Sequence, residues 1–359
     1  MMDKIVFDNI IFGLQNFGGI STYWYELSSR LLNDKNFDSF FITRKNTNLS
    51  GSRLDISKNR SFDQSNTPLF IDRFINPKLG NNLTPFVFHS SYNRCCLNPK
   101  ALNVTTVHDL IHHKYYTGVR KWIHNSQKSY ALMNSKAIIA VSENTKRDLI
   151  KIYPKLDPEI ISVVYNGVSD DYFKIKNVDY HYNLSDDVLK ENYFLFVSSR
   201  AKYKNFNFIV DLLEKLPDFK LYIVGPPINS EESSYLNSKI HSRWKIFTSI
   251  TSKSLNELYN HAFSMLYPSS YEGFGIPILE AMKAFCPFIA LNSTSIPEVA
   301  GDAGILIDEL DINEFIKAVE SINYLRNDLQ LKGKIQVDKF SWDKCYKETS
   351  LIYNKLSSV

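Results

Sequence analysis

The sequence is poor in cysteine, and the few that it has show no functional spacing. Its four cysteines are Cys95, Cys96, Cys286 and Cys345, and they match no metal-ligand pattern. The adjacent Cys95 and Cys96 form a poor disulfide pair. We therefore expect reduced thiols, as in a cytosolic protein.

Long apolar runs and a strong excess of charge are also missing. No run approaches the roughly eighteen apolar residues of a membrane span, and the segment 1–4 leads directly into a strand-like stretch rather than into the apolar core of a signal peptide. We expect a cytoplasmic protein that is soluble or at most peripheral on a membrane surface. The net charge of +4 is too small to indicate a nucleic-acid partner.

Glycine-rich dinucleotide motifs are absent as well. Neither of the two strands that open an αβ series is followed by Gly-x-Gly-x-x-Gly. This absence disfavours a dinucleotide-dependent oxidoreductase.

What the sequence does contain is an alternation of apolar strand-like segments with helical patterns along most of its 359 residues. This alternation predicts the α/β class, with two Rossmann-like, doubly wound parallel-sheet domains that face a central cleft. We assign residues 1–172 to the first domain, 173–192 to a polar linker and 193–340 to the second domain. Residues 341–359 are predicted to form a helix that packs across both domains.

The stretch 271–280 contains two glutamates, Glu272 and Glu280, with two glycines and a proline between them. It follows the strand-like run 262–267 and enters a helical segment at Pro277. Glycines at such a turn let backbone amides approach an anion, and an ionised carboxylate can accept hydrogen bonds from two hydroxyls. Phosphate flanked by hydroxyls indicates a sugar nucleotide.

Two further groups of polar residues follow predicted strands. Arg200 and Lys204 come after the strand-like run 193–198, where they either neutralise a diphosphate or form a solvated basic loop. His108 and Asp109 end a strand of the first domain, so His108 is either a site residue at the cleft or an ordinary structural histidine.

Two weaker signals remain. Gly18-Gly19 precedes the first helix. It either approaches a phosphate or acceptor or forms an ordinary turn. Asn166-Gly167 is a common turn dipeptide.

The segment 112–147 is rich in basic and aromatic residues. It is a solvated helix face, the more frequent case, or a contact surface for an anionic membrane or a lipid diphosphate. Its members are Lys114, Tyr115, Tyr116, Arg120, Lys121, Trp122, Lys128, Tyr130, Lys136, Lys146 and Arg147.

Taken in chain order, these motifs resemble retaining glycosyltransferase family 4, and in particular the bacterial enzymes of O-antigen and other surface-polysaccharide assembly. The stretch Glu272 to Glu280 resembles the EX7E motif of that family, whose two Rossmann-like domains form the GT-B architecture. Ser198 or Ser199 stands where the family usually has glycine. The other matching segments are Gly18-Gly19-Ile20, His108-Asp109-Leu110, Ser142-Glu143, Asn166-Gly167-Val168, Arg200 with Lys204-Asn205, Val224-Gly225 and Phe340-Ser341-Trp342.

The resemblance implies roles for individual residues. Lys204 and Arg200 would hold the donor diphosphate, Glu280 the ribose and Glu272 the transferred sugar. His108 would face that sugar from the other domain. The implied catalytic residues are His108, Glu272, Arg200 and Lys204, and the implied donor-binding residues are Gly19, Arg200, Lys204, Phe274, Gly275, Ile276 and Glu280.

The resemblance also implies a reaction. A metal-independent, retaining enzyme without a cofactor would move a hexose or deoxyhexose, such as mannose, glucose or galactose, from a nucleotide-diphosphate sugar to a glycan acceptor. The acceptor is expected to be lipid-linked, with the enzyme peripheral on the inner face of the cytoplasmic membrane. Asp-x-Asp, which metal-dependent sugar transferases use, is absent from the sequence. The alternatives are transfer to a small soluble acceptor, a UDP-sugar epimerase and a non-catalytic nucleotide-sugar or carbohydrate-binding protein.

Overall fold

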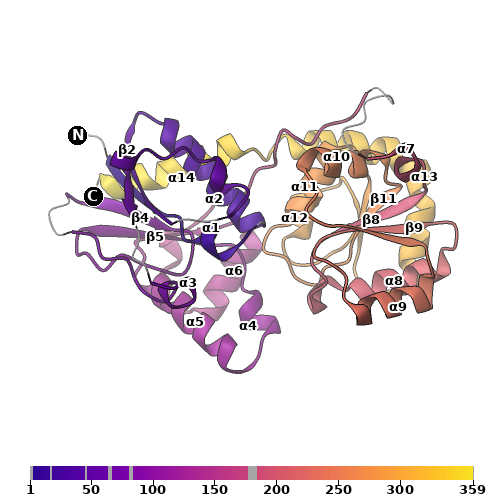
Figure 1. Cartoon of the computed structure of the whole chain (residues 1–359), viewed down its shortest axis with the longest axis horizontal. Helices are drawn as coiled ribbons and strands as arrows, with labels where there is room; N and C mark the ends of the chain where they lie inside the picture. The colour runs from indigo at the N-terminus through magenta and orange to yellow at the C-terminus, as the bar shows by residue number, and fades with distance from the viewer. Residues whose placement is uncertain are drawn as a thin grey trace. The chain divides into compact units, whose positions relative to one another are not determined.

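The computed structural model describes residues 3–16, 18–44, 47–63, 67–80, 84–176 and 184–358. These residues form two compact units, Met1–Asn166 with Trp342–Val359 and Gly167–Ser341. The sequence-based boundaries lay at 172 and 340. Figure 1 labels the helices and strands of each unit.

The first unit is built on a parallel sheet in which we find seven strands within the described ranges. All neighbours pair in parallel. In sheet order the strands are β3 (Ser61–Asp63), β2 (Phe37–Thr43), β1 (Asp3–Asp8), β4 (Phe86–Ser90), β5 (Ala101–Val107), β6 (Ala137–Ala140) and β7 (Ile161–Val163).

Helices connect these strands and cover the sheet. They are α1 (Ile11–Leu14), α2 (Gly19–Asn33), α3 (Leu69–Asp72), α4 (Ile111–Tyr115), α5 (Gly118–Met133) and α6 (Glu143–Ile152), with short 3-10 turns at Gly51–Arg53, Lys58–Arg60 and Pro158–Ile160. Ser142 caps α6 as predicted, because its Oγ accepts from the backbone N–H of Thr145 at 3.0 Å.

The C-terminal helix α14 (Trp342–Ser357) packs on the first unit, against α2 and β4. In Figure 1 the yellow α14 lies among the indigo and purple elements of that unit. The hydroxyl of Tyr353 bonds Nδ1 of the buried His89 at 2.6 Å, and the hydroxyl of Tyr346 donates to Asp34 at 2.8 Å. The predicted packing of this helix across both domains stays a prediction.

The second unit is built on a parallel sheet of six strands, as far as the structure describes it. In sheet order they are β10 (Trp244–Phe247), β9 (Lys220–Val224), β8 (Tyr193–Val197), β11 (Ser264–Tyr267), β12 (Phe288–Leu291) and β13 (Ile305–Ile307). The helices are α7 (Asp186–Leu189), α8 (Phe206–Lys215), α9 (Ser230–Ile240), α10 (Ser252–His261), α11 (Ile276–Lys283), α12 (Ile296–Ala300) and α13 (Ile312–Val337), with a 3-10 turn at Lys202–Lys204.

Both sheets confirm the predicted doubly wound order. Each begins at a central strand, extends to one side and then reverses, between β1 and β4 in the first unit and between β8 and β11 in the second. The central strands are apolar and buried because helices cover both sheet faces. The loops after β1, β4, β8 and β11 therefore lie at the switch points, where open α/β sheets bind ligands.

The predicted linker 173–192 is described in part, since residues 177–183 lie outside the described residues. Its first residues are fixed on α10: the N–H of Phe173 donates to Asn256 at 3.0 Å and that of Ile175 to Asn260 at 2.8 Å. The four cysteines are free, as their spacing led us to expect, and all four are buried.

Candidate functional site

The loops after β8 and β11 are tied together at the switch point of the second unit. Asn205, which has a left-handed φ of 53°, donates from Nδ2 to the carbonyl of Pro268 and to Oγ of Ser270, both at 2.7 Å. The N–H of Ser270 donates to the carbonyl of Tyr203 at 2.8 Å. These bonds fix the turn that carries Lys204 against the loop that carries Glu272.

Lys204 and Glu272 form a buried ion pair between these loops. Nζ of Lys204 lies 2.5 Å from Oε1 of Glu272, and the two residues are 8% and 7% exposed. The ring of Tyr267, at the end of β11, lies beneath the ammonium, 5.6 Å from ring centroid to Nζ. Burial, together with the Glu272 charge, raises the pKa of Tyr267, so this hydroxyl stays protonated. An ammonium has three donors, and one of them is used by Glu272.

The next strand end holds the backbone around Glu272. The N–H of Glu272 donates to Oγ1 of Thr294 at 2.9 Å, and Oγ of Ser295 donates to the carbonyls of Glu272 and Phe274 at 3.0 Å each. Neither Thr294 nor Ser295 was predicted from the sequence to be a site residue. Their signal was available, since they follow the apolar run of β12 and neighbouring parallel strands end at the same sheet edge.

The two glycines of the motif precede the helix α11. Gly275 has φ of 105°, a conformation that strains any residue with a Cβ. The helix begins at Ile276, one residue before the predicted start at Pro277. The predicted anion-binding amides of Phe274, Gly275 and Ile276 thus lie at a helix N-terminus, where the dipole favours negative charge.

Glu280 lies one turn inside α11 in an environment unlike that of Glu272. Its Oε2 accepts from the hydroxyl of Tyr259 at 2.9 Å, and Tyr172 is also bonded to it. Loss of hydration raises the pKa of Glu280 to about 7, although both tyrosine bonds act in the opposite direction. One carboxylate of the motif is therefore paired with a cation, whereas the other is held by phenol hydroxyls.

Arg200 does not join Lys204 in the ion pair with Glu272. Its Nε and Nη2 bond the carboxylate of Glu232 at 2.7 and 3.1 Å, and its Nη1 and Nη2 donate to the carbonyls of Pro226 and Pro227 at 3.0 and 2.7 Å. Glu232 also closes the capping box of α9 with Asn229. Sequence reasoning did not single out Glu232 as the partner of Arg200.

The backbone after β9 comes close to the backbone after β8 at Gly225. A Cβ there would lie 2.4 Å from the carbonyl oxygen of Ser198, so only glycine fits. Val224-Gly225 is one of the segments that resemble the family, and Ser198 or Ser199 stands where the family has a further glycine. Gly225, after β9, therefore lets the ends of β8 and β9 approach closely.

In the first unit, His108 follows β5 and lines a cavity of ≈ 670 Å³. Its ring lies edge-on to Tyr23, with centroids 4.8 Å apart. Burial lowers the pKa of His108 to about 4, so the imidazole is neutral at physiological pH. Gly19 is the first residue of α2, and its neighbour Ile20 lines the same cavity.

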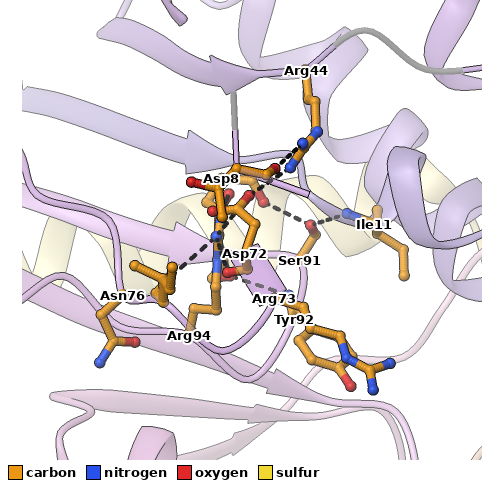
Figure 2. A network of polar contacts seen from close by, with 12 residues as sticks. Asp8, Ile11, Arg44, Asp72, Arg73, Asn76, Ser91, Tyr92 and Arg94 are labelled. Carbon is orange, nitrogen blue, oxygen red and sulfur yellow. Dashed lines mark hydrogen bonds and ion pairs between the residues drawn. The ribbon is translucent and has the colours of Figure 1, made fainter. Parts of the chain in front are cut away.

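A buried ion network lies at the ends of β1 and β4 (Figure 2). Arg94, 1% exposed, bonds both carboxylate oxygens of Asp8 at the end of β1. Its Nη1 also donates to the carbonyls of Asp72 and Ile75 at 3.1 and 3.2 Å. Arg44 donates to the Asp72 carboxylate at 2.9 Å. The network thereby anchors the segment after α3, which carries Arg73 and Phe74 of the cavity wall.

The basic and aromatic segment forms α4, α5 and the region up to α6. Several of its large apolar residues are exposed, among them Val119 at 72% and Trp122 at 70%, whereas others such as Leu132 and Ile138 are buried. Some of its cations are already bound: Lys114 pairs with Asp148 at 2.9 Å, and the buried Lys128 donates to the carbonyl of Asp109 at 2.7 Å. The side chain of Arg120 lies outside the described residues.

Neither a membrane-crossing helix nor a metal cluster is found in the described ranges. No helix there has both the length and the apolar content of a membrane span. No group of three or more His, Cys, Asp or Glu side chains is placed there to hold a metal ion.

Comparison with known proteins matches both units to glycosyltransferases. Residues 17–172 match the Glycosyltransferase Family 4 model, and residues 185–330 match the model for glycosyl transferases group 1. The O-antigen chain mannosyltransferase B of Escherichia coli is 37% identical over 111 residues, which are 30% of this chain and 29% of that protein. The O-antigen chain mannosyltransferase RfbU of Salmonella typhimurium is 27% identical over 226 residues, covering 61% and 60%. The chain thus spans less than two thirds of these relatives.

A solved structure shows the same fold over the whole length. Sucrose-phosphate synthase from Thermosynechococcus elongatus superposes with a TM-score of 0.76 at 16% identity, covering 99% of both chains. The two parallel-sheet units therefore have the GT-B fold. The chain belongs to the glycosyltransferases, with a family 4 domain followed by a group 1 domain.

Proposed function

We propose that this protein is a retaining glycosyltransferase that moves a hexose or deoxyhexose from a nucleotide-diphosphate sugar to a glycan acceptor of a bacterial surface polysaccharide. The observation that carries the proposal is the buried pair of Lys204 and Glu272 at the switch point, beside the N-terminus of α11. The similarity to O-antigen mannosyltransferases supports the acceptor class and favours mannose among the sugars.

In this proposal, Lys204 and the first amides of α11 hold the donor diphosphate. The ammonium uses one hydrogen for Glu272 and has two left for phosphate oxygens. Because negative charge grows on the departing diphosphate, a fixed cation there stabilises the transition state more than the bound donor. The chain itself supplies this charge, which fits a reaction without a resident metal.

Glu272 and Glu280 bind hydroxyl groups of different parts of the donor. Glu272, which pairs with Lys204, orients the transferred sugar and so positions its anomeric carbon. It does not attack that carbon covalently. Glu280 holds the ribose, and Tyr259 and Tyr172 orient its carboxyl group. The leaving phosphate then accepts the proton of the acceptor hydroxyl on the same face of the sugar, which retains the anomeric configuration.

Unlike Lys204, Arg200 uses most of its hydrogen-bond donors within the protein. Its four hydrogen bonds go to Glu232 and to the carbonyls of Pro226 and Pro227. Four of its five N–H donors are thereby used, which leaves one N–H, on Nη1, for a donor phosphate. Lys204 therefore carries the main charge contact in the described conformation.

The acceptor is proposed to be lipid-linked, and α5 is proposed to contact the membrane surface that presents it. Trp122 and Val119 are exposed there, and Lys121 adds a cation on the same helix. Such a combination of apolar and basic side chains suits an interfacial contact with anionic lipid.

The test is a panel of nucleotide sugars. Thermal shift identifies the donor, because a ligand that binds only the folded state raises the apparent stability. The protein is then incubated with that donor, with and without lipid-linked or soluble glycan acceptors. Nucleotide release with a lengthened glycan supports the proposal, and the anomeric signal of the product tests retention. Interconversion of nucleotide sugars would instead indicate an epimerase, and binding without turnover would indicate a non-catalytic protein.

A further inference from the structure

The imidazole of His108 is held by packing rather than by a hydrogen bond to its Nε2. That nitrogen is buried and has no hydrogen-bond partner among the described residues. The ring of Tyr23 lies against the imidazole, at 84° and with centroids 4.8 Å apart. Tyr23 is fully buried on α2. Its position therefore limits the orientations that are open to the His108 ring.

The hydroxyl of Tyr23 is bonded to two threonines from different elements. It lies 3.2 Å from Oγ1 of Thr106 on β5, and it also forms a side-chain hydrogen bond with Thr349 of α14. The ring of Trp342, the first residue of α14, lies at 67° to that of Tyr23, with centroids 6.1 Å apart. Tyr23 thus lies between the C-terminal helix and His108.

Thr106 also ends a buried chain of hydrogen bonds that starts on α14. The hydroxyl of Tyr353 lies 2.6 Å from Nδ1 of His89, and Nε2 of His89 lies 2.9 Å from Oγ1 of Thr106. His89 is fully buried on β4, and the ring of Trp24 packs edge-on against it with centroids 4.7 Å apart. The chain of bonds therefore runs from Tyr353 through His89 and Thr106 to Tyr23.

Burial sets the charge of the imidazole in the middle of this chain. Loss of hydration lowers the pKa of His89 to about 3, so its ring is neutral at physiological pH. A neutral imidazole has one donor and one acceptor nitrogen, and the bond at one nitrogen determines the role of the other. Removal of the Tyr353 hydroxyl would leave Nδ1 unpaired in the core. Because a buried polar group without a partner is costly, the bonds of Thr106 and Tyr23 should then rearrange.

We propose that Tyr23 is a positioning residue that fixes the ring of His108 for the transfer reaction. Tyr353 of α14 fixes Tyr23 in turn, through His89 and Thr106. The inference rests on the proposed function and on the role that the family resemblance implies for His108 toward the transferred sugar. Within the described residues, neither Tyr23 nor Tyr353 lines the cavity beside His108, so both act through that histidine. Misplacing a group in the site by about 1 Å can lower a rate about 100-fold.

The experiment removes single hydroxyls from the chain of bonds and observes His108 directly. Tyr353→Phe and Tyr23→Phe each keep the ring and lose the hydroxyl. The matched control is Tyr346→Phe, the same substitution on α14 at a hydroxyl that bonds outside the chain. Thr106→Val and Thr106→Ser form a second matched pair, in which serine keeps the hydroxyl that valine lacks.

Two measurements are made on the full chain. The ¹H–¹³C spectrum of the histidine Cε1 groups reports on His108, whose signal is identified by its loss in His108→Asn. Steady-state kinetics use the donor found in the nucleotide-sugar screen. In Tyr353→Phe, Tyr23→Phe and Thr106→Val we expect this signal to shift or broaden. In the same variants kcat should be at least about tenfold lower, with the donor KM within about twofold of the wild type. Tyr346→Phe and Thr106→Ser should behave as the wild type.

Tyr353→Phe decides the inference, because its effect must pass through three other side chains. An unchanged His108 signal in this variant would overturn the proposal. So would a kcat equal to that of Tyr346→Phe in an enzyme that turns over, or a loss confined to the donor KM. Near-ultraviolet circular dichroism reports whether each variant is folded, and Thr106→Val against Thr106→Ser provides the test if Tyr353→Phe is not. If no nucleotide sugar turns over, the proposed function fails, whereas the His108 signal still decides whether Tyr353 positions that ring.

Discussion

Substitutions of Lys204 and Glu272, the two partners of the buried ion pair, should change the affinity for nucleotide in opposite directions. Lys204→Met removes the ammonium that lies 2.5 Å from Oε1 of Glu272 and leaves that carboxylate facing the bound diphosphate. Losing one preorganised charge costs about 2–4 kcal/mol of transition-state stabilisation. We therefore expect kcat/KM to fall roughly 30- to 900-fold and the affinity for a nucleoside diphosphate to fall as well.

Glu272→Gln has the opposite effect on binding. The variant keeps the shape of the side chain but removes the negative charge that neutralises Lys204. The full positive charge then acts on the diphosphate, and binding should tighten by on the order of 1 kcal/mol, about fivefold. Turnover should still fall, because the carboxylate that orients the sugar is gone.

Calorimetric titration with UDP and GDP, together with steady-state kinetics on the donor found in the screen, measures both effects. Lys202→Met is the matched control, because Lys202 lies on the same turn but is exposed. Turnover of Lys204→Met within about threefold of the control would refute the role of Lys204 in the chemical step. Weaker nucleotide binding by Glu272→Gln would refute the charge balance derived from the pair.

Three further predictions concern the other groups. Burial raises the pKa of Glu280 to about 7, above its unfolded value of about 4.3. The folded state thus holds the extra proton, and the free energy of unfolding should fall as pH rises from about 4.5 to 7. In Glu280→Gln, melting curves should no longer show this dependence of stability on pH. An unchanged dependence would contradict the assignment. Arg94→Met leaves Asp8 buried without its cation and should cost about 3–5 kcal/mol in denaturant unfolding. Adding Asp8→Asn should recover part of that loss, and a loss below about 1 kcal/mol would show that the network does not stabilise the first unit. Trp122→Ala and Lys121→Gln should each weaken partitioning onto anionic vesicles, by about fivefold for the lysine, and equal partitioning of both variants and the wild type would exclude α5 as the contact surface.

Local patterns in the sequence were sufficient to predict the doubly wound α/β class and many of the elements, but not the helices α9 and α13 or the strand β13. The apolar run 262–267 became β11, and Ser142 caps α6 as its position indicated. Strand and helix periodicity, caps and glycine turns depend on neighbouring residues, so one sequence reveals them. Because parallel strands end at one sheet edge, the same patterns also located Lys204 and Glu272 near each other.

The sequence alone thus determined two doubly wound units and the glycine turn before α11, whereas the tertiary structure decided the partner of each charged group. Arg200 forms an ion pair with Glu232, and the carboxylate of Glu280 accepts hydrogen bonds from Tyr259 and Tyr172. These partners lie on loops and helices that are far apart in the sequence, so no local sequence pattern relates them. Hydration and pairing set the charge of a buried group, and both depend on distances that exist only after the chain has packed.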